Sequence, residues 1–89
     1  MLTFPKSVII KFKDIVPYSA PMPMIDIILD KAEEFFVQEK TDLEVNFVDE
    51  SSTQRYFVDQ EAAEEWVNFI KEVTSKYDYD IVEYKIFDV

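Results

Sequence analysis

Hydrophobic side chains recur along this chain with two different periods, and the order of those periods limits the folds that the chain can adopt. Alternation at every second residue, with β-branched and aromatic side chains, is typical of strands. Recurrence at three and four residues is typical of an amphipathic helix. The predicted strands cover residues 6–16, 43–48, 54–58 and 82–87, and the predicted helices cover residues 23–40 and a segment that begins after its N-cap Asp59 and ends at residues 77–80.

One apolar stripe on each helix and one cleaner apolar face on each strand can be buried in two layers. The order strand, helix, strand, strand, helix, strand therefore predicts one α+β domain, residues 1–89, with the ferredoxin-like βαββαβ fold. We expect an antiparallel sheet in the order 4-1-3-2, with both helices on one face. Three prolines predict a connecting loop at residues 17–23, and the polar cluster at residues 49–52 predicts a hairpin turn.

The chain contains no glycine, histidine or cysteine in its 89 residues. It therefore lacks imidazole and thiolate chemistry, and it cannot form a glycine-rich phosphate loop. The remaining carboxylates, tyrosines, lysines and hydroxyls follow no spacing that specifies a mechanism, so we expect no enzyme, no catalytic residue, no cofactor and no metal site. The lack of cysteine fits a cytoplasmic location, and no segment resembles a signal peptide or a membrane span.

Nine basic and nineteen acidic residues give the chain a formal net charge of -10. This charge repels phosphate polyanions and anionic membranes, so neither nucleic acid nor a membrane is an expected partner. The acidic helices could instead imitate the phosphate spacing of DNA, or they could simply form a solvated charged surface. The residues of this predicted acidic helix face are Asp30, Glu33, Glu34, Glu61, Glu64 and Glu65.

The pleat of a strand turns alternate residues to opposite faces of a sheet, so the apolar alternation also predicts which residues point away from the helices. We expect the helix-covered face to carry Val8, Ile10, Phe12, Leu43, Val45, Phe47, Tyr56, Val58, Val82, Tyr84 and Ile86. The opposite, open face is expected to make contacts through Ile9, Lys11, Lys13, Arg55, Phe57, Lys85 and Phe87. Four of these seven side chains are cations, whereas both helices carry a surplus of acid.

Residues 55–59, Arg-Tyr-Phe-Val-Asp, lead into Glu61-Ala62-Ala63. This stretch resembles the end of the third strand and the start of the second helix of the RNA recognition motif, and the resemblance implies base stacking on Phe57. Cross-strand charge pairs on a solvated surface explain the same cations more simply. The predicted topology is also similar to that of dimeric α+β barrel proteins of the antibiotic-biosynthesis monooxygenase type, whose paired sheets enclose a ligand cavity.

These observations predict a small acidic, non-enzymatic binding or regulatory protein that acts through protein contacts. We expect a homodimer that forms through the open sheet face or through the edge strands two and four. The acidic helices would steer a basic protein partner. An acidic nucleic-acid mimic and a dimeric barrel with a ligand cavity remain the alternatives.

Overall fold

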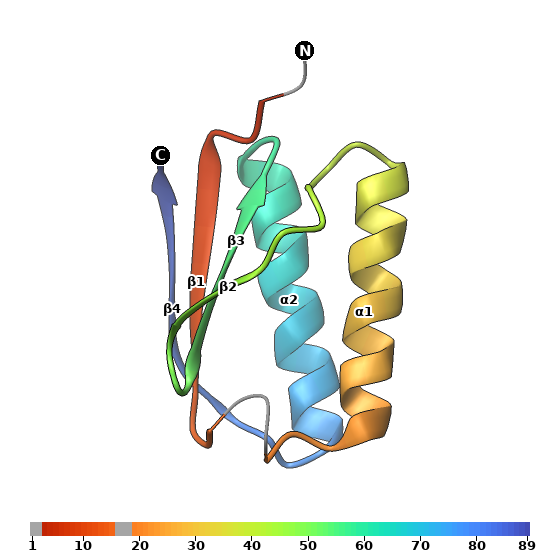
Figure 1. The fold of residues 1–89 in the computed structure, drawn as a ribbon, viewed down its shortest axis with the longest axis vertical. Helices are drawn as coiled ribbons and strands as arrows, with labels where there is room; N and C mark the ends of the chain where they lie inside the picture. Colours follow the sequence, from red (N-terminus) through yellow and green to blue (C-terminus); the bar gives the residue numbers. More distant parts are fainter. Residues whose placement is uncertain (1–2, 16–18) are drawn as a thin grey trace.

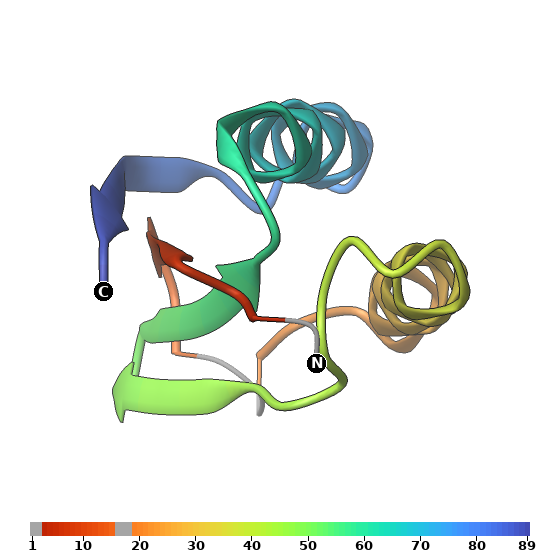
Figure 2. The same cartoon turned by 90° about the horizontal axis from the view of Figure 1, so that it is seen from above.

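A computed structural model describes residues 3–15 and 19–89 of the chain. The elements follow in the order β1 (Lys6–Phe12), α1 (Met22–Val37), β2 (Asn46–Asp49), β3 (Ser52–Phe57), α2 (Gln60–Lys76) and β4 (Ile81–Asp88). The sheet has the order β2-β3-β1-β4, and every neighbouring pair is antiparallel. Both helices lie on one side of it (Figures 1 and 2). The predicted ferredoxin-like α+β fold is confirmed.

Helix α2 begins at a side-chain cap, and both helices end next to a non-glycine residue in the left-handed conformation. Helix α2 begins at Asp59, whose carboxylate accepts a hydrogen bond of 2.8 Å from the backbone N–H of Ala62. A cap of this kind is worth about 1 kcal/mol. After each helix one residue takes the left-handed conformation: Glu39 follows α1 with φ 61° and Asp78 follows α2 with φ 53°. Glycine usually fills this position because other residues pay a steric cost there.

The core lies between α2 and the central strands. From the sheet, β1 contributes Val8, Ile10 and Phe12, which are all at most 5% exposed. The backbone of α2 lies close to β1, β3 and β4, while that of α1 approaches only α2 among the described elements. Helix α1 therefore reaches the sheet through long side chains rather than by close backbone packing.

The side chains of β3 point to the opposite sides of the sheet from those predicted. Its antiparallel register places Arg55 opposite Val8 and Phe57 opposite Lys6, so both side chains point toward the helices. Phe57 is 0% exposed and Arg55 is 7% exposed, and the prediction that they lie on the open face is therefore wrong. Tyr56, Phe57 and Val58 are three consecutive apolar residues, and a period of two cannot decide which of them faces the core.

The ends of the strands account for the other differences. Strand β1 ends at Phe12, so Lys13 lies beyond the sheet, and Leu43 precedes the short β2 and is exposed. A register shift after Lys11 leaves Val82 exposed instead of facing the helices. The predicted end of the first strand and the start of the following loop, residues 16–18, lie outside the described residues.

The remaining predicted contact residues do lie on the open face. Ile9 is paired with Lys85, and Lys11 lies opposite Glu83. Phe87 pairs with Ser7 on the same face, because directly opposed residues in antiparallel strands point the same way. The open face is therefore a mixed polar surface with two cations from the predicted set.

Because Phe57 points toward the helices and Phe87 does not, replacing these two residues by alanine should have very different effects on stability. Phe57→Ala removes a fully buried ring and should lower the free energy of unfolding by about 3–5 kcal/mol. Phe87→Ala, on the open face, should lower it by less than about 1 kcal/mol. Urea unfolding followed by circular dichroism measures both values. A similar loss of unfolding free energy in the two variants would show that Phe57 does not point toward the helices.

Candidate functional site

The outer edge of β4 is the longest unpaired backbone edge in the described part of the sheet. This strand has eight residues and pairs only with β1, on its inner side. Figure 1 shows it in blue at one side of the sheet. The other outer strand, β2, has four residues and an irregular register, which makes it a poor template for pairing. An open edge of eight residues is a site at which another strand can add.

Apolar and charged side chains share this edge strand. Val82 is 59% exposed, Tyr84 is 43% exposed and Phe87 is 39% exposed. Between them lie Glu83 and Lys85, whose side chains are on the open face. The edge therefore combines exposed hydrophobic area with charges of both signs, Glu83 and Lys85 at its centre and Asp88 at its end, a pattern that a complementary strand can recognise.

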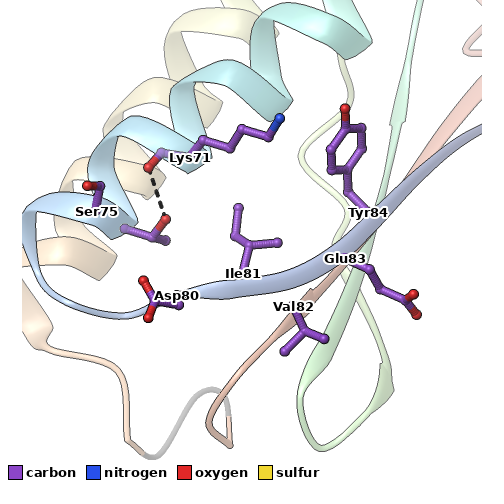
Figure 3. A pocket seen from close by; sticks show the side chains of 8 residues that line it. Lys71, Ser75, Asp80, Ile81, Val82, Glu83 and Tyr84 are labelled. Carbon is purple, nitrogen blue, oxygen red and sulfur yellow. Dashed lines mark hydrogen bonds between the residues drawn. The ribbon is translucent and has the colours of Figure 1, made fainter.

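A groove of about 440 Å³ lies between α2 and β4 (Figure 3). The Lys71 ammonium group is 4.4 Å from the centre of the Tyr84 ring, a cation–π contact that joins the helix to the strand. The Thr74 hydroxyl donates to the carbonyl of Ile70 at 2.6 Å and therefore turns back to its own helix. The groove is open and shows no convergent set of catalytic groups. It brings a cation and an aromatic ring beside the β4 edge.

The open face of the sheet is polar at its centre. The side-chain amide of Gln54 donates to the hydroxyl of Ser7 at 2.7 Å across β3 and β1. Because Arg55 and Phe57 are buried, they cannot stack on RNA bases at this face. The base stacking on Phe57 that the resemblance to the RNA recognition motif implies is therefore wrong.

The predicted acidic residues of the helices are all exposed, but they do not form one surface. Glu34 and Glu65 line a groove between α1 and α2, whereas Glu33 lines a different groove on the other side of α1. Lys40 is 2.8 Å from Glu65, and this hydrogen bond raises the pKa of Lys40 above its ordinary value. Lys31 pairs with Glu34 at 3.4 Å. Cations thus interrupt the acidic surface between the helices.

A buried arginine is the feature that sequence reasoning missed. The guanidinium carbon of Arg55 is 5.2 Å from the centre of the Trp66 ring, and within the described residues its Nη1 atom has no hydrogen-bond partner. Oδ1 of Asp42 is also buried without a partner in that part of the chain. Burial lowers the pKa of Arg55, and the nearby charge of Asp42 raises it. The clue in the sequence was the apolar run after Arg55, which allows β3 to turn this residue inward.

Comparison with known proteins returned no matching protein family, curated protein or solved structure. Across residues 3–15 and 19–89, none of the helices has the length and apolar character needed to cross a membrane. In the same residues, no group of three or more side chains is placed to hold a metal ion.

The charges of Arg55 and Asp42 should be coupled in their effect on stability. Asp42→Asn leaves the buried guanidinium without the nearby opposite charge and should cost about 1–3 kcal/mol of the free energy of unfolding. The double variant Arg55→Met/Asp42→Asn keeps most of the side-chain volume and removes both charges, so it should differ from the original chain by less than about 1 kcal/mol. Urea unfolding at pH 7 measures both. A greater loss for the double variant than for Asp42→Asn would mean that the guanidinium is a net stabilising group.

Proposed function

We propose that this protein is a non-enzymatic binding protein that acts through protein contacts, and that a second copy of itself docks on the β4 edge. The observation that carries the proposal is the sequence of the centre of β4, Glu83-Tyr84-Lys85, which is complementary to itself when two strands run antiparallel. With Tyr84 on the two-fold axis, Glu83 of each copy lies opposite Lys85 of the other. Both oppositely charged pairs then form on the open face, where these side chains already point.

The same register places apolar side chains together. Tyr84 meets Tyr84 of the second copy at the axis, and Val82 lies opposite Ile86. Opposed residues keep the same face in an antiparallel pair, so residues 83–85 of the two copies match face to face, and the register shift beside Val82 limits the regular pairing to this central part of the strand. The exposed areas of Val82 and Tyr84 would be covered, and the unpaired backbone groups of the edge would gain partners.

The net charge of each copy opposes association. Two chains of charge -10 repel one another, but this long-range repulsion is screened beyond about 8 Å at physiological ionic strength. The Glu83–Lys85 pairs act at contact distance, where screening matters least. Self-association is therefore expected to need moderate salt, and the uneven helix acids remain available to steer a basic partner to the dimer.

Two further parts of the proposal rest on composition. Without imidazole or thiol groups, the chain has none of the side chains that most often act as nucleophile or proton shuttle near pH 7, which supports a binding role. The absence of cysteine is compatible with a reducing compartment, so we place the protein in the cytoplasm.

Charge reversal tests the docking of β4 on itself. Glu83→Lys places like charges opposite each other twice in the dimer, as does Lys85→Glu, so each variant should raise the dissociation constant of the dimer at least about tenfold. The double variant Glu83→Lys/Lys85→Glu restores both pairs and should recover most of the affinity. Sedimentation velocity over a range of protein concentrations measures the dissociation constant.

A matched control separates this effect from a general change in charge. Glu44→Lys alters the net charge by the same amount on an exposed residue outside the strands, and it should leave the dissociation constant nearly unchanged. Because Glu83 also lies opposite Lys11 within the chain, urea unfolding should accompany each variant. A monomer at all concentrations, or a double variant as weak as the single ones, would refute this contact.

A further inference from the structure

A partly open cavity of about 130 Å³ lies between α1, α2 and the β2 side of the sheet. Met24, Ile28, Val45 and Trp66 are among the side chains that line it, and Thr53 and Arg55 are the polar residues of its lining within residues 3–15 and 19–89. An apolar protein cavity of roughly 150 Å³ is large enough to hold benzene. The cavity therefore has room for a compact organic molecule with a hydrocarbon body.

Arg55 gives this apolar cavity a specific chemical character. Its side chain is 7% exposed, and the described part of the chain offers no hydrogen-bond acceptor to its Nη1 atom. A buried donor without an acceptor is costly, and a guanidinium group favours a planar anion such as carboxylate. The cavity thus pairs a mostly hydrocarbon lining with one cationic side chain, Arg55.

The carboxylate of Asp42 is the charged group of the chain that acts on the guanidinium group of Arg55. Its charge acts on Arg55, yet no ion pair within 4.0 Å joins the two side chains, and Oδ1 of Asp42 is itself buried without a partner in the described residues. The two charges are therefore only loosely compensated. A ligand carboxylate that reaches the guanidinium group of Arg55 would make a contact that Asp42 does not make.

A second groove shows how a ligand can reach the cavity. Leu29 and Arg55 line both the cavity and an outer groove that also includes Phe36, Val37 and Leu43. Leu29, Val37 and Leu43 are each more than half exposed. Arg55 thus lies between the cavity and a mostly apolar surface groove, whose one acidic lining residue in the described chain is Glu33. A carboxylate held by Arg55 would stay close to this groove while its hydrocarbon part enters the cavity.

From this arrangement we propose that the cavity binds a small aliphatic monocarboxylic acid, with the carboxylate on Arg55 and the branched hydrocarbon body against Met24, Ile28 and Trp66. The volume limits the body to a few carbons, and the apolar lining excludes a second charge or several hydroxyl groups. This site is separate from the β4 edge and does not depend on the proposed dimer.

Titration with 3-methylbutanoate tests the proposal, with 3-methylbutanamide as the neutral control of the same shape. Trp66 is the single tryptophan, so its indole N–H resonance in a nitrogen–proton correlation spectrum reports directly on the cavity. We expect a saturable shift with a dissociation constant on the order of 1 mM for the acid. The amide should bind at least about tenfold more weakly, because it carries no negative charge and has one acceptor oxygen, so it cannot form the bidentate ion pair of a carboxylate with guanidinium.

Two variants assign the effect to the residues named. Arg55→Met should bind acid and amide equally weakly, and Asp42→Asn should bind the acid several-fold more tightly while its affinity for the amide stays unchanged. If Arg55→Met does not fold, the acid–amide difference and Asp42→Asn still decide the matter. Equal affinity for acid and amide in the original chain, no saturable binding, or no gain for Asp42→Asn would overturn the proposal.

Discussion

The packing of one ring, Phe57, decides what each surface of this protein presents. Phe57 lies between Phe35 of α1 and Trp66 of α2, with ring centres 6.3 Å and 5.8 Å away. Because it occupies this position, every other residue of β3 is turned to the same face, and Arg55 enters the core beneath Trp66. The same choice sends Gln54 and Tyr56 outward. The polar open face and the buried side chain of Arg55 therefore both follow from the packing of Phe57 between the two helices.

The sequence predicted those features that depend on neighbouring residues. The element order follows from local periodicity, and the Asp59 cap follows from local hydrogen bonding. The sheet order then follows from the fold that this element order indicates. The facing of β3 depends on contacts with α1 and α2, which are distant in sequence, so the run from Tyr56 to Val58 was ambiguous. The position of Lys13 was missed for a similar reason, because the end of β1 is set by its partners across the sheet.

The two left-handed turns connect the helices to the two candidate sites. After α1, Glu39 lets the backbone N–H of Lys40 reach back to the carbonyl of Phe35 at 2.8 Å, and the chain then returns along β3 and brings Asp42 to Arg55. After α2, Asp78 allows the equivalent bond from Tyr79 to Thr74 at 3.0 Å and directs the chain into β4. Glycine would relieve the steric cost but would also loosen both connections in the unfolded and folded chain.

The two proposed sites are separated by the sheet itself. The order β2-β3-β1-β4 places the docking edge at one side, while Arg55 lies on β3 with β1 between it and β4. Helix α2 and strand β1 are common to both sites, since Trp66 lies over Arg55 and Lys71 over Tyr84, and β1 lies beside β4 while its Ile10 and Phe12 line the cavity. Neither Glu83 nor Lys85 lines the cavity, and substitutions far apart with no shared partner act nearly additively. A protein that binds the acid but does not dimerise would refute only the proposed dimer. A protein that dimerises but does not bind the acid would refute only the proposed cavity site.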